Sequence, residues 1–188
     1  MATSQSRLAN IKEIRAGAGD DIVDLTSDRF DYTGGGLSVH GGLGDDTIWS
    51  NNGNNTLFGD AGNDRLVGAG GNDIIVGGAG NDSMHGGGGD DVFAFGGDWG
   101  NDNVKQLADG KVTLWFDSGS QDKWDAASLT YQDGDKSVKV SGVAASAVTL
   151  KFGDDGSAQY GKLLEIGAFE EYSSERIFEN RNTRGMLA

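Results

Sequence analysis

The chain has 188 residues, a length that suits one domain or one capped repeat array, and 33 of them are glycine. Its formal net charge of −14 makes nucleic acids and anionic membrane surfaces poor partners. It has no cysteine for disulfides or thiolate sites, and no apolar run approaches the roughly twenty residues that a membrane span needs.

The chain begins with residues 1–15, an N-terminal lead-in whose first ten residues lack the apolar core of a cleaved signal peptide. Residues 16–24 (AGAGDDIVD) then form a nine-residue unit. In this unit Gly19 is at position 4, Asp21 at position 6 and Val23 at position 8.

An irregular insertion, residues 25–40, separates this unit from the next one. Its length is close to that of two nine-residue units, so we interpret it as a degenerate, distorted coil. In that interpretation Phe30 and Tyr32 close the core of the array. The alternative is a ligand-binding loop built on these two aromatic side chains.

Six blocks of nine residues follow without a gap from Gly41 to Ala94. Each block has Gly at position 4, Asp or Asn at position 6 and an apolar residue at position 8. The residues at position 8 are Ile48, Leu57, Leu66, Ile75, Met84 and Phe93. A fixed period sustained this long predicts a solenoid, in which each unit stacks on its neighbours.

Each block divides into a glycine-rich turn of six residues and a strand of three. Because side chains alternate along a strand, the residue at position 8 points inward and its two neighbours point outward. Two blocks make one flattened coil, so blocks n and n+2 lie side by side. This stacking brings Asp46 next to Asp64, Asp64 next to Asp82, and Asp73 next to Asp91.

Two blocks depart from the pattern. Ser50 to Phe58 has Asn55 at position 6, so we expect its site with Asp73 to be weaker or missing. A last repeat, residues 97–105, is shifted by two residues and places Asp102 beside Asp82.

Stacked carboxylates repel one another unless a cation neutralises them. The span from Gly41 to Lys105 contains ten Asp and no Glu. Carboxylate and carbonyl oxygens in turns suit Ca²⁺, which takes roughly six to eight oxygen ligands. The candidate ligands, through Asp or Asn side chains and through carbonyl groups next to glycines, are Asp21, Gly42, Gly44, Asp46, Asn55, Gly62, Asp64, Gly71, Asp73, Gly78, Gly80, Asp82, Gly87, Gly89, Asp91, Gly100 and Asp102.

We expect roughly four to six Ca²⁺ ions in this array. One inward apolar side chain per nine residues makes a thin core. Metal binding and folding are therefore expected to be coupled.

The outward positions predict two different sheet faces. One face carries Thr47, Trp49, Arg65, Val67, Ser83 and His85, and the other carries Thr56, Phe58, Ile74, Val76, Val92 and Ala94. A free surface normally avoids an apolar face like the second one. We expect the C-terminal region to pack on it; the alternative is a partner-binding or self-association face.

After Lys105 the repeat ends and a C-terminal capping region, residues 106–188, begins. Four strands are predicted at 111–116, 129–131, 137–140 and 147–152, with acidic and glycine-rich turns between them. We interpret 108–169 as a small sheet that covers the last coil, with a helix within 158–169. A second short helix is predicted through Glu175 and Phe178, followed by a polar tail, 180–188, as a possible secretion signal.

His40 and His85 are the only histidines, and neither falls in a Ser-His-Asp or HExxH sequence pattern. Zn²⁺ would need more nitrogen or sulfur ligands than the repeats offer. We therefore expect no catalytic residue and no enzymatic activity.

The pattern G-G-x-G-x-D-x-U-x, repeated in register from Gly41, resembles the RTX, or hemolysin-type, calcium-binding repeat. The resemblance implies an all-β parallel β-roll with a C-terminal β-rich capping region and a short helix. It also implies Ca²⁺ between successive turns, an uncleaved C-terminal export signal and a type I secretion apparatus as partner.

On this resemblance we expect the chain to be the C-terminal part of a larger secreted or cell-surface protein, such as an adhesin, surface-layer protein or toxin. Low cytosolic Ca²⁺ would keep it unfolded for export, and millimolar Ca²⁺ outside would fold it. The alternative is a module with structural Ca²⁺ that recognises a protein or glycan partner, or self-associates.

Overall fold

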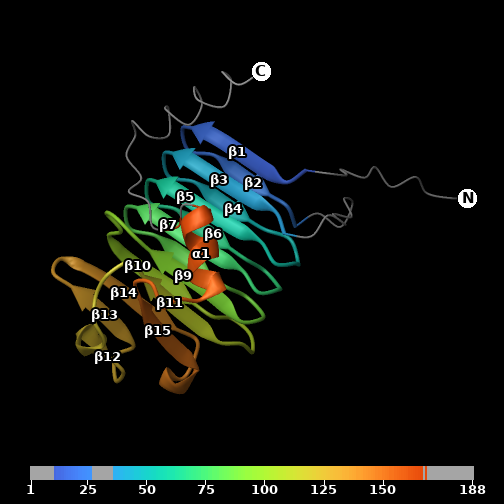
Figure 1. The fold of residues 1–188 in the computed structure, drawn as a ribbon. Helices are drawn as coiled ribbons and strands as arrows, with labels where there is room; N and C mark the ends of the chain where they lie inside the picture. The colour runs from blue at the N-terminus through green and yellow to red at the C-terminus, as the bar shows by residue number, and fades with distance from the viewer. Residues whose placement is uncertain (1–10, 27–35, 167, 169–188) are drawn as a thin grey trace, which may run out of the picture.

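The protein is a two-sheet solenoid in this computed structural model, which describes residues 11–26, 36–166 and 168 (Figure 1). From β1 to β11 successive strands alternate between the two sheets, so each coil contributes one strand to each. This arrangement confirms the parallel β-roll predicted from the nine-residue period.

Sheet A is wholly parallel in the described residues. Its strands, in spatial order, are β1 (Glu13–Ala18), β3 (Ser38–Leu43), β5 (Thr56–Ala61), β7 (Ile74–Ala79), β9 (Asp91–Phe95), β11 (Val112–Phe116) and β15 (Val148–Phe152).

Sheet B is parallel over its repeat strands and antiparallel at its C-terminal end. Its spatial order is β12 (Trp124–Asp125), β13 (Thr130–Asp133), β14 (Lys136–Ser141), β10 (Asn101–Lys105), β8 (Ser83–His85), β6 (Arg65–Val67), β4 (Thr47–Trp49) and β2 (Ile22–Asp24).

The core lies between the sheets and consists of the predicted inward series. Ile48, Leu57, Leu66, Ile75, Met84 and Phe93 are fully buried. Strands β2, β4, β6 and β8 of sheet B have the expected three residues, but β3, β5 and β7 of sheet A have six. They are longer because the first residues of the following turn also pair with the neighbouring coil, as Asp60 does with Gly78.

We expected the insertion to form a degenerate coil. It does not form a complete one, because β1 pairs directly with β3. The register aligns Ile14 with Val39, 25 residues apart, whereas regular coils repeat every 18 residues. The connection from β2 to β3 is therefore about seven residues longer than in a regular coil. Residues 38–40, the last of the predicted insertion, belong to β3. Phe30 and Tyr32 lie outside the described residues.

The C-terminal capping region extends the roll. All four predicted strands are present, as β11, β13, β14 and β15. The expected separate small sheet is wrong, since β11 pairs with β9, β15 with β11, and β14 with β10. A strand added in register satisfies the open backbone edge of the last repeat coil, which a separate sheet would leave unpaired.

An aromatic cluster fills the core at this end of the roll. The ring of Phe116 stacks at 4.0 Å from that of Tyr131 and at 4.9 Å from that of Phe95, and Trp99 and Phe152 complete the cluster. These side chains are much larger than the aliphatic residues of the repeats. The last coils therefore have a thicker apolar core than the others.

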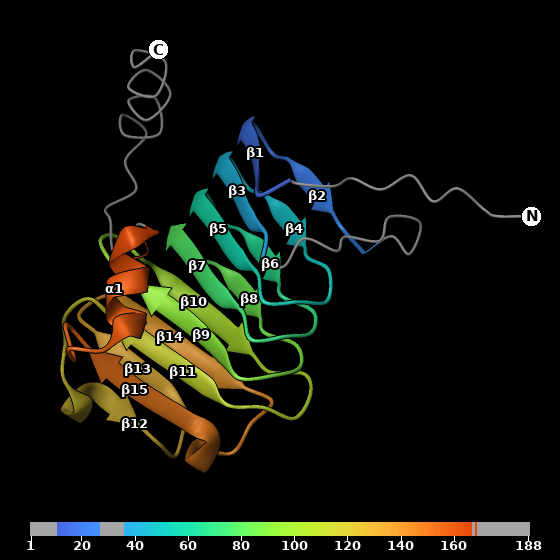
Figure 2. The same ribbon diagram turned by 45° about the vertical axis from the view of Figure 1, so that its right-hand side comes forward.

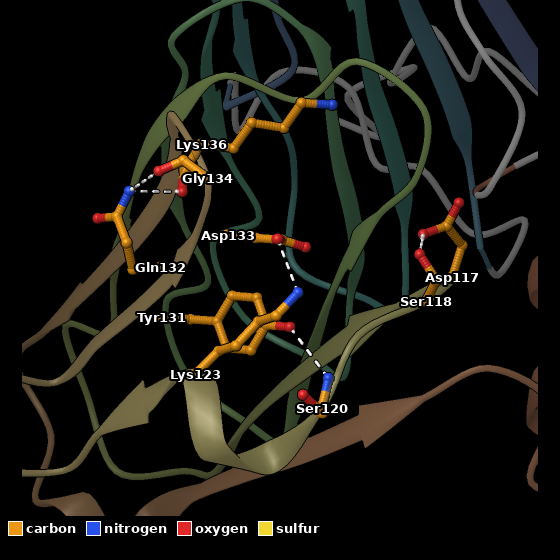
Figure 3. Close-up of polar contacts among 9 residues, drawn as sticks. All are labelled: Asp117, Ser118, Ser120, Lys123, Tyr131, Gln132, Asp133, Gly134 and Lys136. Carbon is orange, nitrogen blue, oxygen red and sulfur yellow. Dashed lines mark hydrogen bonds and ion pairs between the residues drawn. The ribbon is translucent and has the colours of Figure 1, made fainter.

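Polar contacts hold the segments around Tyr131, as Figure 3 shows. The backbone N–H of Ser120 donates to the Tyr131 hydroxyl at 3.3 Å, and Lys123 Nζ donates to Asp133 at 2.7 Å. Ser120 directly precedes the 3-10 helix η1 (Gln121–Lys123), and a second one, η2 (Ala145–Ala147), precedes β15. These bonds tie η1 to the β13–β14 hairpin.

Helix α1 (Ala158–Glu165) lies across sheet A (Figures 1 and 2). Leu163 and Ala168 are buried with Phe58, Val76 and Trp115 in one cluster on the outward face of this sheet. The expectation that the C-terminal region packs on the apolar face is confirmed. The second predicted helix and the tail lie outside the described residues.

No helix in the described part of the chain is long and apolar enough to cross a membrane.

Replacing Leu163 by Ala tests the packing of α1 on sheet A. We expect Leu163→Ala to lower the free energy of unfolding by about 2–4 kcal/mol, because the side chain is fully buried. Lys162→Ala on the exposed side of α1 is the control and should change stability by less than about 0.5 kcal/mol. Urea unfolding in Ca²⁺ measures both, and equal effects would contradict this packing.

Candidate metal centres in the stacked turns

Two columns of side chains run along the roll, one on each edge. The long column lies in the turns from sheet A to sheet B and consists of Asp21, Asp46, Asp64, Asp82 and Asp102. The short column lies in the turns from sheet B to sheet A and consists of Asn55, Asp73 and Asp91. All the carboxylate pairs predicted from the period are brought together, including the shifted pair Asp82 and Asp102.

One oxygen of each stacked carboxylate holds the turns in register. Asp64 Oδ1 accepts the backbone N–H of Asp46 at 2.7 Å, and Asp82 Oδ1 accepts that of Asp64 at 2.8 Å. The same bond recurs along both columns at 2.7–2.9 Å. All the column Asp residues except Asp21 therefore use one carboxylate oxygen for structure, and the second oxygen is left for another partner.

The second carboxylate oxygen is buried in most of these residues and has no hydrogen-bond partner. The Oδ2 atoms concerned belong to Asp21, Asp46, Asp64, Asp73, Asp82 and Asp102. An unpaired buried carboxylate oxygen is costly, because it has lost its hydration and gained nothing in return. Six such atoms in two regular columns fit positions where a cation binds.

Glycine at position 1 of five of the six blocks leaves the space that such a cation would need. A Cβ added at Gly59 would collide with Asp64 Oδ2 and lie 2.5 Å from the carbonyl oxygen of Gly77. Gly41 and Gly68 have the same pair of neighbours, an Oδ2 atom and a carbonyl oxygen of the next coil. Our sequence analysis missed these glycines, although position 1 is Gly in five of the six blocks.

The glycines predicted from the sequence as carbonyl ligands, at positions 2 and 4, allow the backbone conformation and the close stacking of the turns. Gly42, Gly44, Gly62, Gly71, Gly78, Gly80, Gly87 and Gly89 all have positive φ. A Cβ on Gly62 would collide with the carbonyl oxygen of Gly44, and one on Gly100 with that of Gly80. Only glycine allows the turns to stack this closely while their carbonyl groups stay near the columns.

A second ladder at position 5 was also missed. Asn63 N–H donates to Asp45 Oδ1 at 2.7 Å, and Asn81 N–H donates to Asn63 Oδ1 at 3.0 Å. Position 5 is Asp or Asn in all six blocks, which is the signal that could have revealed it. These exposed side chains hold the turns in register beside the buried columns.

Burial raises the pKa of six column carboxyls, since a charge is poorly solvated inside the protein; they belong to Asp46, Asp64, Asp73, Asp82, Asp91 and Asp102. The pKa rises to about 8 for Asp64 and for Asp102, to about 7 for Asp73 and to about 6 for Asp82. The backbone N–H groups lower each pKa, but they do not offset burial. The neighbouring carboxylate of Asp91 also raises that of Asp73.

Within the described ranges, no three carboxylate or imidazole side chains converge on one point. The donor set of each turn is therefore one or two carboxylates completed by backbone carbonyl oxygens. Such hard oxygen ligands suit Ca²⁺ better than Zn²⁺, which prefers nitrogen and sulfur. The residues present fit calcium, and calcium would supply the positive charge that the columns lack.

His40 lies outside the columns and bridges three strands. Its Nδ1 is 3.2 Å from Asp60 Oδ2, its Nε2 is 3.5 Å from Ser38 Oγ, and its ring stacks on Phe58. The structure thus joins Ser38, His40 and Asp60, which the sequence pattern did not indicate. Because Glu13 also faces Nε2 at 3.8 Å, we interpret this group as a cross-strand contact.

Comparison with protein families gives one match. The model of the RTX calcium-binding nonapeptide repeat matches residues 13–29, 38–66 and 67–104, in four copies. Comparison with curated proteins gave no match. The matched residues include both columns, so the family and the geometry select the same turns.

Replacing Gly59 by Ala tests the space beside Asp64. The added methyl group would collide with Asp64 Oδ2 and crowd the carbonyl oxygen of Gly77. We expect one Ca²⁺ ion fewer per chain and a loss of about 1–3 kcal/mol in stability. The control is Gly88→Ala, whose Cβ would lie 3.7 Å from Ala108; calorimetric titration measures both, and equal ion counts would contradict the assignment.

The raised pKa values predict how the metal-free protein responds to pH. A carboxyl whose pKa is higher in the folded state than its unfolded value near 3.8 favours folding at low pH. This contribution is fully present below about pH 4 and is lost as pH rises toward 8, the pKa of Asp64 and Asp102. Metal-free protein should therefore gain β structure by circular dichroism between pH 8 and pH 5.

The variant Asp64→Asn/Asp102→Asn should weaken this dependence. Asp155→Asn is the control, because Asp155 is exposed and its hydrogen bonds to Ser157 and Lys151 hold its pKa at about 2. A metal-free protein whose β content falls on acidification would contradict the prediction.

Proposed function

We propose that extracellular Ca²⁺ drives the folding of this module, because its stacked coils match the RTX calcium-binding repeat. This folding supports type I secretion and the extracellular folding of a larger adhesin, surface protein or toxin. In this role the module binds metal for its structure and catalyses no reaction.

The observation that carries the proposal is the set of buried Oδ2 atoms without partners. Asp46, Asp64 and Asp82 stand one above another in the long column, and each has one such atom. Without a cation, their ionised forms repel one another in a poorly solvated place. With a cation between successive turns, the same repeats become the attractive contact between coils.

The proposed ligands are the carboxylates of the two columns and the carbonyl oxygens of their turns. Four to six Ca²⁺ ions per chain follow from the number of carboxylate pairs. Extracellular calcium modules bind with dissociation constants of about 10⁻⁴–10⁻³ M, far above the cytosolic concentration and near the extracellular one. Binding on that scale would keep the chain unfolded inside the cell and fold it outside.

The capping region supports the proposal, because it supplies a core that needs no metal. Its aromatic cluster around Phe116 and Tyr131 packs directly beyond the last repeat coil. Nucleating a solenoid costs entropy, and a pre-packed end lowers that cost for the coils that follow. Ca²⁺ would then propagate the roll from this end toward the N-terminus.

The alternative function, recognition through the apolar sheet, loses its main support. The outward residues of sheet A, including Phe58 and Val92, are buried in one cluster with Leu163 of α1. The insertion around Phe30 and Tyr32 is the other candidate surface, and it lies outside the described residues.

Export by a type I secretion system tests the proposal. We expect chains fused to a passenger to reach the medium faster with about 2 mM external Ca²⁺ than with chelator, since folding outside prevents backward movement. Asp64→Asn/Asp82→Asn should abolish this difference, and Asp155→Asn should preserve it. Export of the wild type at the same rate with and without Ca²⁺ would overturn the proposed role in secretion.

A further inference from the structure

On the premise that the roll binds Ca²⁺, we infer that two side-chain amides, of Asn55 and Gln106, replace the ion at the two ends of the short column. The roll then has unequal edges. The long column binds metal along its length, and the short column binds it only around Asp73.

Gln106 occupies the turn of Asp91 with its amide nitrogen. Nε2 donates to the carbonyl oxygens of Gly87 and Gly89 at 3.0 and 3.2 Å, and it is 3.0 Å from Asp91 Oδ2. These three oxygens belong to positions 2, 4 and 6 of a single turn. The Gln106 side chain is also almost fully buried, so it is a built part of this turn.

Asp91 is the exception among the Asp residues of the two columns. The Oδ2 atoms of Asp73, Asp82 and Asp102 are buried without a partner, whereas Asp91 Oδ2 accepts a hydrogen bond from Gln106. Asp91 Oδ2 is therefore not among the unpaired oxygens, although the amide's own oxygen, Gln106 Oε1, is buried without a partner. The amide hydrogens thus satisfy the oxygen that a cation would otherwise satisfy.

Asn55 repeats this arrangement at the other end of the column. Its Nδ2 donates to the carbonyl oxygens of Asn51 and Gly53 at 2.9 and 2.8 Å, which are again positions 2 and 4 of the turn. Position 1 of this block is Ser50, whereas in the other blocks it is a Gly whose added Cβ would collide with the carboxylate. Both changes remove the space and the charge that a metal ion needs.

The topology explains why these substitutions fall at the column ends. The coil after Asp91 places Val112 in register with it, so the column of carboxylates stops there. The coil before Asn55 places the backbone N–H of Leu37 against Asn55 Oδ1 at 3.2 Å. A cation at either end would meet a carboxylate from one coil at most, whereas an amide nitrogen needs only nearby oxygens as acceptors.

A turn that holds a neutral amide and a turn that holds a divalent cation differ in the number of ions they add to the chain, which can be measured. The two hydrogens of the amide nitrogen are shared among nearby oxygens and leave the charge unchanged, so Asp91 Oδ2 has a hydrogen-bond donor at any Ca²⁺ concentration. Giving these turns a carboxylate and the missing space should create new ion sites. The number of bound ions per chain is therefore the direct readout.

The test counts Ca²⁺ ions per chain by native mass spectrometry, with calorimetric titration of the same samples. We expect one additional ion in Gln106→Glu and one in Ser50→Gly/Asn55→Asp, relative to the wild type. The matched control is Gln132→Glu in the exposed β13–β14 hairpin, where the count should stay unchanged. The two designs alter opposite ends, so either one tests the inference if the other fails to fold.

Unchanged counts in both designs would overturn the inference while leaving Ca²⁺ binding intact. A loss of one ion in Gln106→Ala would also overturn it, because the amide oxygen of Gln106 would then be a metal ligand. A wild-type chain that binds no Ca²⁺ would instead overturn the proposed function itself.

Discussion

The stacked carboxylates are the constraint on which the rest of the roll depends. Each column Asp uses one oxygen to fix the register of the turns, and this places its second oxygen in a buried position. The same geometry that stacks the coils therefore concentrates negative charge along both edges. Glycine at positions 1, 2 and 4 allows this close approach, and one inward apolar side chain per nine residues makes only a thin core between the sheets.

The repeat coils and the capping region differ in the size of their apolar cores. The repeats have one inward apolar side chain per nine residues and, on the proposed function, cations at their edges, whereas the capping region buries large aromatic rings around Phe116 and Tyr131. Because β11, β14 and β15 continue both sheets in register, the aromatic core of the capping region and the repeat coils share one ladder of hydrogen bonds. Helix α1 covers the apolar outer face of sheet A, which would otherwise be exposed.

Much of this arrangement could be predicted from the nine-residue period. The period determines which side chains point inward and which carboxylates stack, because both follow from register. The pair of Asp82 and Asp102 could also be predicted, since the last repeat keeps the pattern with a shift of two residues. The prediction that the insertion forms a degenerate coil was wrong. The insertion is nearly as long as one coil, and a sequence of that length does not distinguish a coil from a long connection to β3. Gln106 could not be found from the pattern, because it lies outside the repeat and reaches back across one coil to Asp91. The contact of His40 with Asp60 is likewise set by strand pairing and by no local pattern.

On the proposed function, cations in the two columns hold the repeat coils together. The most direct measurement is far-ultraviolet circular dichroism of metal-free protein during a Ca²⁺ titration, with Mg²⁺ as the control. If cations hold the coils together, β structure should rise cooperatively with Ca²⁺ near millimolar concentration. Mg²⁺ should cause no comparable change, because it is smaller and holds its water more tightly. A spectrum that shows complete β structure in chelator at neutral pH would contradict it.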